Sequence, residues 1–170
     1  MRAYRLAYDG RPYYGYQRQP DVPTVEDTLF AGLEAIGVVE NGEPPPNYAA
    51  AGRTDAGVSA VAQTVAFEAP DWCTPAAVNA ELPGSVRAWA AADVDESFHP
   101  TRDAVRRTYV YHLHAPDADD TAASAAAAKL SGKHDFHNLT SDDHRTGRDV
   151  SAAVDRDGEF LVVEVSAGGF

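Results

Sequence analysis

Alternating apolar and polar positions predict strands along much of the chain. The segment Arg2–Asp9 (RAYRLAYD) shows this period of two clearly, and QTVAFE shows it again further on. The last such segments flank Asp157-Gly158, a dipeptide typical of hairpin turns. Strands are therefore expected over residues 2–9, 63–68, 86–94 and 108–114, and a hairpin is expected from 151–155 and 159–165.

Helical spacing appears between these segments. Thr24 is a candidate N-cap with Asp27 three residues later, and Gly37 is a plausible stop after apolar residues at helical intervals. The pair Thr74-Pro75 predicts a short helix through Leu82. Residues 117–130, acidic first and alanine-rich afterwards, suit a helix dipole. Strands interleaved with short helices, together with a hairpin, favour an α+β architecture over a doubly wound parallel sheet.

Composition narrows the class of protein. The 170 residues are 44% hydrophobic, but no apolar run approaches the roughly 18 residues that a transmembrane helix needs. The first residues, MRAYR, do not resemble a signal peptide. Cys73 is the single cysteine, which excludes an internal disulfide framework. We therefore expect a cytoplasmic globular protein that is not bound to a membrane.

The charge points to a salty cytoplasm. The formal net charge is -12, with Lys129 and Lys133 as the only lysines. A dense carboxylate surface is a device of halophilic proteins, although an ordinary acidic protein is the alternative. Negative charge does not exclude a nucleic-acid partner in brine, because the Debye length in molar salt is about 3 Å. Counterion release also contributes little there, so stacking and shape carry more of the affinity.

The segment Gly52–Gly57 (GRTDAG) is the strongest candidate for chemistry. Two glycines let the backbone turn sharply and approach a ligand, and Arg53 and Asp55 could pair across the mouth of the loop. An ionised, partly desolvated aspartate can act as a nucleophile. The alternative from the pattern alone is an Asx-turn in which Asp55 only binds backbone N–H groups.

Two aromatic segments suit contacts with an unstacked nucleic acid. A tyrosine-rich loop places aromatic rings beside planar hydrogen-bonding groups, and a later strand alternates Tyr109 and Tyr111 on one face after two arginines. Ordinary packing of the tyrosines is the alternative for both. The candidate RNA-binding residues are Tyr14, Gln17, Arg18, Gln19, Arg106, Arg107 and Tyr111.

Metal and nucleotide-cofactor sites find little support. His134, His137 and His144 lie in a segment expected to be loop, and neither cysteines nor a His-x-x-x-His helix accompany them. No GxGxxG, GxxxxGK[ST] or GxSxG motif occurs. We expect no metal and no cofactor.

Taken together, the motifs resemble the TruA family of tRNA pseudouridine synthases. YDGRPYYGYQRQ is similar to the family's opening motif, and AGRTDAGVSAVAQTVAF is similar to its GRTDAGVHA signature. NAELPGSVR and FHPTRDAVRRTYVYHL match two further motifs in the family's order, and KHDFHNLT matches a later one more loosely. Family members continue beyond a motif like SAGGF into a basic segment, which is absent from these 170 residues.

The resemblance implies isomerisation of uridine to pseudouridine in the anticodon arm of tRNA, without metal or organic cofactor. By the matching motifs, Asp55 is the catalytic aspartate, Arg53 the arginine that pairs with it, and Tyr109 the tyrosine that stacks on the target base. The implied fold is a pseudouridine synthase fold with a mixed, mainly antiparallel sheet flanked by helices. It has two ferredoxin-like subdomains, residues 1–104 and 105–170, the second incomplete. A homodimer that binds one tRNA is also implied.

Two other functions stay open. A chain without the family's last segment could bind tRNA without turning it over. An acidic α+β module could instead serve protein interaction alone.

Overall fold

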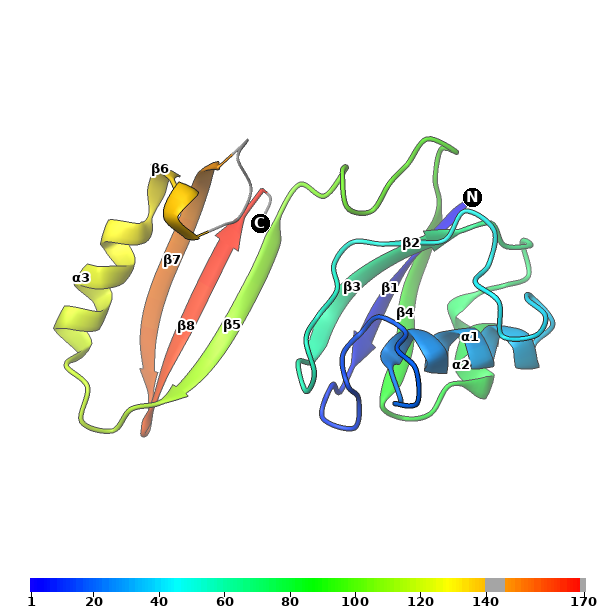
Figure 1. Ribbon diagram of the computed structural model, residues 1–170, viewed down its shortest axis with the longest axis horizontal. Coiled ribbons are helices and arrows are strands. Elements are labelled where there is room, and N and C mark those ends of the chain that lie inside the picture. Colours follow the sequence, from blue (N-terminus) through cyan, green and yellow to red (C-terminus); the bar gives the residue numbers. More distant parts are fainter. Residues whose placement is uncertain (140–145, 169–170) are drawn as a thin grey trace. The chain divides into compact units, whose positions relative to one another are not determined.

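A computed structural model describes residues 1–139 and 146–168 of the chain. The chain forms two compact units, Met1–Asp103 (unit 1) and Ala104–Phe170 (unit 2). Each unit contains one four-stranded sheet, as the ribbon in Figure 1 shows.

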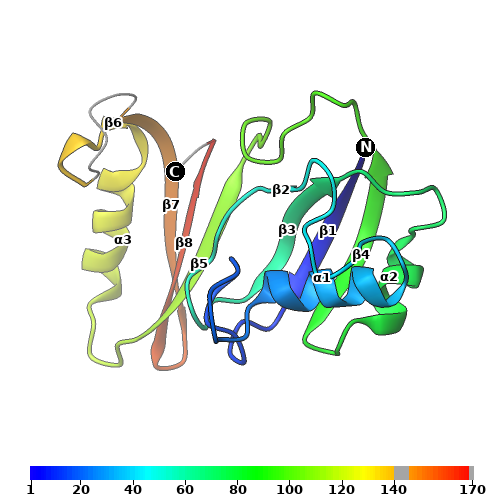
Figure 2. The ribbon, with the colours of Figure 1, turned by 45° about the vertical axis from the view of Figure 1, so that its right-hand side comes forward.

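Unit 1 is built on an antiparallel sheet whose strand order is β2-β3-β1-β4. Its helices α1 and α2 both lie against one face of this sheet (Figures 1 and 2). In chain order the elements are β1 (Arg2–Tyr8), α1 (Val25–Ala35), β2 (Ala49–Ala50), β3 (Ala60–Phe67), α2 (Pro75–Glu81) and β4 (Val86–Asp93).

The core of unit 1 lies between the sheet and its helices. Tyr4, Leu6 and Tyr8 alternate along β1 and are all buried, which places them on the helix-covered face. Tyr4 stacks on Phe67 of β3 with 4.8 Å between ring centroids. From α1 the core receives Val25, Leu29, Phe30 and Leu33.

Both ends of α1 follow the prediction from sequence. The Thr24 side chain accepts a hydrogen bond from the Asp27 backbone N–H at 3.1 Å, as the predicted N-cap requires. The Asp27 carboxylate accepts in turn from the Thr24 hydroxyl at 2.5 Å. At the other end Gly37 has φ +75°, which favours glycine. The N–H groups of Gly37 and Val38 donate to the carbonyls of Glu34 and Leu33, completing a Schellman motif.

Unit 2 contains a second antiparallel sheet, in the order β5-β8-β7-β6. Its helix α3 packs mainly on β7. Arg156 of β7 reaches the start of this helix, donating to the Asp120 carboxylate and to the carbonyls of Ala115 and Ala118. The elements are β5 (Arg107–His114), α3 (Asp120–Leu130), β6 (Gly132–Asp135), the 3-10 helix η1 (His137–Leu139), β7 (Gly147–Asp157) and β8 (Phe160–Ala167).

The α+β class predicted from the sequence is confirmed, and every strand pair in the described residues is antiparallel. The expected hairpin exists but is longer, because β7 and β8 pair from Asp157↔Phe160 to Val150↔Ala167. The sequence missed β2 and β6. His134 lies in β6, so the expected loop there is wrong; His137 lies in η1, and His144 lies outside the described residues.

Within residues 1–139 and 146–168, the helices are too short or too polar to cross a membrane.

Candidate functional site

The GRTDAG segment forms a loop, residues 52–59, between β2 and β3 of unit 1. Gln63 of β3 holds its first residue, because the side-chain Nε2 donates to the Gly52 carbonyl at 2.5 Å. A turn closes inside the loop, where the Val58 N–H donates to the Asp55 carbonyl at 3.1 Å. Gly57 adopts φ +80° within this turn, a conformation that side chains disfavour. The backbone on both sides of Asp55 is therefore fixed.

A second loop, residues 10–16, docks against the 52–59 loop. The Tyr16 N–H donates to the Thr54 carbonyl at 2.9 Å, and the Gly57 N–H donates to the Tyr13 carbonyl at 3.2 Å. The Gly10 N–H donates to the Ser59 hydroxyl at 3.0 Å. Beneath the loop, the Tyr8 and Thr54 hydroxyls share a hydrogen bond of 2.8 Å. Hydrogen bonds along its length thus hold the candidate loop in place.

Glycine is required where the two loops meet. A Cβ built on Gly10 would lie 2.0 Å from the Val58 carbonyl oxygen, well inside van der Waals contact. Gly15 has φ +107°, and a Cβ there would lie 3.0 Å from the Thr54 oxygen. The glycines of the YDG-x-x-x-x-G pattern therefore serve the close approach of two backbones.

Two of the three clustered tyrosines belong to the core. Tyr13 and Tyr16 are buried, whereas Tyr14 is 59% exposed. The Tyr16 and Tyr48 hydroxyls lie 2.5 Å apart, and burial raises the pKa of both phenols far above the usual range. They are neutral at any physiological pH, so their part is structural. Packing, the alternative considered for this loop, holds for Tyr13 and Tyr16.

Arg53 and Asp55 are both exposed on the 52–59 loop. The expected ion pair between them is not formed: over the described ranges, neither side chain has a hydrogen bond or salt bridge. The Asx-turn alternative is not seen either, since the Asp55 carboxylate binds no backbone N–H in that part of the chain. Asp55 is thus an accessible carboxylate on a fixed backbone. Such a group can approach a ligand without first rearranging the loop.

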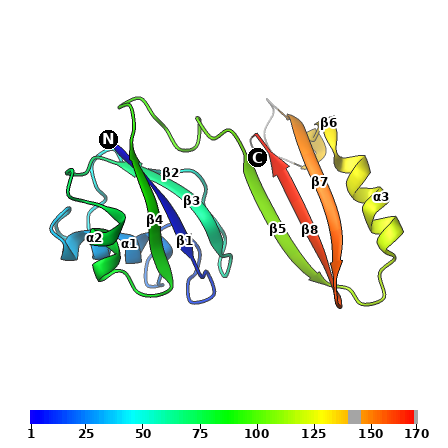
Figure 3. The same ribbon diagram turned by 180° about the vertical axis from the view of Figure 1, so that it is seen from behind.

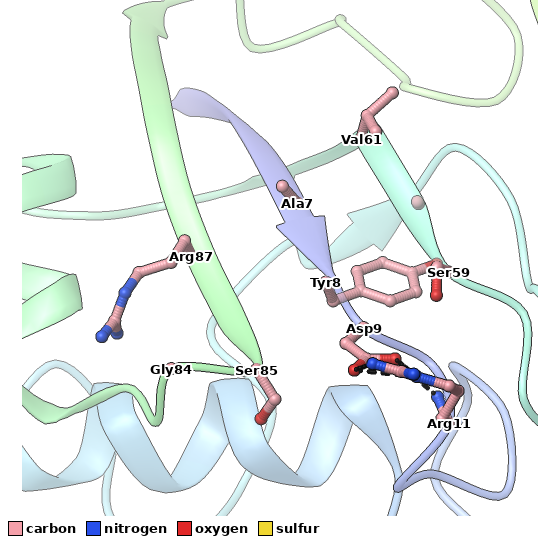
Figure 4. Close-up of a pocket in the computed structure, with 10 residues that line it drawn as sticks. Ala7, Tyr8, Asp9, Arg11, Ser59, Val61, Gly84, Ser85 and Arg87 are labelled. Atoms are coloured by element: carbon pink, nitrogen blue, oxygen red, sulfur yellow. Dashed lines mark hydrogen bonds and ion pairs between the residues drawn. The ribbon is translucent and has the colours of Figure 1, made fainter.

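A shallow depression of about 450 Å³ lies close to this loop, lined by Ser59 but not by Asp55. Figure 4 shows Asp9 and Arg11 on one side of it and Arg87 on another. Arg11 binds the Asp9 carboxylate at 2.7 Å, and this pairing lowers the pKa of Asp9 to about 2. Asp9 and Arg11 therefore form a charge-neutral pair.

The other candidates in unit 1 differ in how they are held. The Gln19 amide donates to the Tyr14 carbonyl at 2.7 Å, and Gln17 is exposed. Arg18 forms an ion pair with Asp27 at 2.7 Å and lies over the Phe30 ring at 5.3 Å. Arg18 is thus bound to α1, a structural contact that its position in the motif did not reveal.

The remaining candidates lie on unit 2. Arg106 precedes β5, and Arg107, Tyr109 and Tyr111 lie within it. The two tyrosines share a face, as the alternation predicted, opposite Val165 and Val163 of β8. Tyr109 is half-buried and Tyr111 is 57% exposed. The structure thus gathers the candidates into one loop region of unit 1 and one strand of unit 2.

Sequence reasoning missed several residues that hold the 52–59 loop. Tyr8, Gln63 and Ser59 lie within the quoted motifs, but nothing in the pattern shows that they bind the loop. Over the described residues, no three histidine, cysteine or acidic side chains gather as a metal site would require.

The amino-acid sequence is similar to those of several known proteins. No protein-family model matches it. It is 60% identical over 172 residues to the tRNA pseudouridine synthase A of Natronomonas pharaonis, covering 100% of this chain and 64% of that protein. The protein of the same name from Haloarcula marismortui is 59% identical over 180 residues, covering 100% and 66%. That of Archaeoglobus fulgidus is 40% identical over 172 residues, covering 99% and 63%. The chain thus spans somewhat less than two thirds of the length of these relatives.

Proposed function

Because the chain belongs to the family of tRNA pseudouridine synthase A, we propose that it isomerises uridine to pseudouridine in tRNA, within the anticodon arm. One observation carries the assignment of the site: Asp55 presents an exposed carboxylate on a loop whose backbone is held on both sides. An enzyme of this class needs a reacting group that is accessible to the sugar and held in a fixed position.

The chemistry follows from the bonds that must change. The C1′–N1 glycosidic bond of the uridine breaks, a C1′–C5 bond forms, the C5 proton leaves, and N1 takes up a proton. The glycosidic carbon is shielded in a stacked strand, so the nucleotide first flips out. Asp55 then starts cleavage, by attack on C1′ or by taking a proton from the sugar. The freed uracil rotates and rejoins through C5.

The other candidates take supporting parts in this proposal. Tyr109 stacks on the uracil and limits its escape, and it is the candidate for transfer of the C5 proton. Arg53 pairs with Asp55 once RNA is bound; in support, both side chains are exposed on the same loop and neither has a partner among the described residues. The residues that contact the RNA are Tyr14, Gln17, Gln19, Arg106, Arg107, Tyr111 and Arg18, the last held against α1 by its ion pair with Asp27.

Fold and assembly are also part of the proposal. Unit 1 is ferredoxin-like, supported by its β-α-β-β-α-β order and by β3 lying between β1 and β2 in the sheet. Unit 2 does not follow this sheet order, because β8 intervenes between β5 and β7. Two copies of the chain bind one tRNA. The protein acts in the cytoplasm.

The test is tritium release from tRNA that carries uridine labelled at C5, in molar potassium chloride. The unaltered chain releases tritium, and Asp55→Asn releases none while its affinity for tRNA is kept. Asp117→Asn is the matched control, since it removes one exposed carboxylate from unit 2 and leaves release unchanged. Release by Asp55→Asn at the rate of the unaltered chain contradicts the catalytic assignment. Retained tRNA binding without release from any variant indicates the non-catalytic alternative.

A further inference from the structure

Trp89 lies at an irregularity in the sheet of unit 1. In the β1–β4 pairing, Leu6 lies opposite Ala88 and Arg5 lies opposite Ala90, so Trp89 is the extra residue of a β-bulge. Bulges re-aim a side chain, and this one sends the indole sideways across the sheet. Its Nε1 donates to the Val61 carbonyl of β3 at 3.0 Å.

This hydrogen bond fixes the orientation of the ring. Strands β4 and β3 flank β1, so they lie about 10 Å apart and the indole must cross β1 to reach Val61. On the helix-covered face, Leu6 and Tyr8 fill the space. Trp89 is 56% exposed and therefore lies on the opposite face, where Figure 3 shows strands without a helix over them. A ring anchored at its edge in this way offers its flat side to solvent.

Arg5 and Arg87 also lie on this face, since each alternates with buried neighbours along its strand. Arg5 lies beside the bulge, with its guanidinium bound to the Ala62 carbonyl at 3.0 Å. Arg87 lines the depression of Figure 4, and its guanidinium donates to the Leu82 carbonyl at 2.5 Å. The Asp9 carboxylate, which also lines this depression, is neutralised by Arg11. In a chain of net charge -12, a face that carries Arg5 and Arg87 is complementary to phosphate.

We propose that Trp89 stacks a base of the RNA other than the reacting uridine, with Arg5 and Arg87 beside its phosphates. The inference rests on the proposed function, which supplies the RNA. Aromatic rings beside arginines bind unstacked bases of any sequence, because every base has a π-face. In molar salt the phosphate contacts weaken while stacking persists, so a halophilic protein gains most from the ring.

The chain offers a matched control in its second tryptophan. Trp72 is 52% exposed, in the turn before α2, and the two residues differ little in exposure. Trp89→Ala weakens tRNA binding about 10-fold in molar potassium chloride, the scale expected for one stacked base, and Trp72→Ala leaves it unchanged. Trp89→Phe restores most of the affinity although it lacks the N–H, because the phenyl ring still stacks. Trp89→Leu does not restore it.

Fluorescence tests the contact itself. In Trp72→Phe, Trp89 is the only tryptophan, and added tRNA quenches its emission by stacking. In Trp89→Phe, the emission of Trp72 is unaffected. Circular dichroism verifies that each variant is folded.

Two outcomes separate this inference from the function on which it rests. If Trp89→Ala binds tRNA as tightly as the unaltered chain, or if tRNA leaves the emission of Trp89 unchanged, the stacking site is wrong while Asp55-dependent tritium release stands. If the unaltered chain neither binds tRNA nor releases tritium, the proposed function fails and the inference fails with it.

Discussion

Unit 1 and unit 2 each contain a four-stranded antiparallel sheet, but they differ in what covers it. Every residue of the large buried cluster lies in unit 1. Unit 2 has one helix on its sheet in the described residues, and its buried apolar residues are Ala127, Val150, Leu161 and Ala167. Six of its larger apolar side chains are more than 40% exposed: Val105, Val110, Tyr111, Leu113, Leu130 and Phe160.

The difference shows where the fold takes its stability and where the candidate chemistry sits. Apolar area removed from water is the main favourable contribution to folding. Because the buried apolar cluster lies in unit 1, most of this stabilisation belongs to unit 1. The loop that carries Asp55 rests on this well-packed unit, joined to buried Tyr8 through Thr54. The aromatic residues of β5 lie instead on a sheet with little buried beneath it. The loop of unit 1 that carries Asp55 and the strand of unit 2 that carries the candidate tyrosines therefore differ in how well they are supported.

The largest difference between the units is expected when one leucine in each is truncated to alanine. Leu33 is fully buried, so Leu33→Ala leaves a cavity and costs about 2–5 kcal/mol of unfolding free energy. Leu113 is 56% exposed, and Leu113→Ala costs less than about 0.5 kcal/mol. Denaturant titration can follow unit 1 separately, because both tryptophans lie in it. Equal costs for the two variants would remove the contrast between the units.

A smaller effect on folding, but a large one on activity, is expected at the glycines. Gly10→Ala forces its Cβ against the Val58 carbonyl and pushes the 52–59 loop away. A displacement near 1 Å lowers tritium release about 100-fold. Gly168 of unit 2 is the counterpart, since its Cβ would lie 3.6 Å from the Val105 oxygen, an ordinary contact. Gly168→Ala therefore leaves release unchanged, and normal release from Gly10→Ala would show that the docking of the loops does not matter.

The contact of Gly10 with Val58 joins segments far apart in the chain, and the sequence predicts such contacts less well than local ones. Contacts between neighbours in the chain were predictable: Thr24, Asp27 and Gly37 define α1 through local hydrogen bonds alone. Contacts between distant segments were not. Three tyrosines in one loop look alike, and only the fold decides that Tyr16 is buried while Tyr14 is exposed. The same holds for Trp89, whose direction depends on the strand register, and for β2 and β6, which are too short to show alternation.

Helix caps sharpen the comparison at a scale of about 1 kcal/mol. Thr24 caps α1 in unit 1, and Asp119 caps α3 in unit 2 by accepting from the Thr121 and Ala122 N–H groups. Thr24→Ala and Asp119→Ala each lose about 1 kcal/mol of helix stabilisation. Tryptophan fluorescence detects the first and not the second, whereas far-ultraviolet circular dichroism detects both. A shift of the fluorescence transition by Asp119→Ala would mean that the two units unfold as one.

The smallest expected effect is the loss of stability from one ion pair in each unit as the pH falls. Pairing with Arg11 lowers the pKa of Asp9 to about 2, and pairing with Arg156 lowers the pKa of Asp120. A carboxylate whose pKa is lower in the folded state stabilises the fold above its unfolded pKa, near 3.9, and loses this contribution as the pH falls through the folded value. The melting-temperature deficits of Arg11→Ala and Arg156→Ala are therefore full at neutral pH and shrink below about pH 4. The deficit is larger for Arg156→Ala than for Arg11→Ala. The Arg156 side chain is 24% exposed and also binds two carbonyls, whereas the Arg11 side chain is 83% exposed. An Arg11→Ala deficit that grows in acid would contradict the pairing, since removing a partner cannot matter more once the carboxyl is protonated.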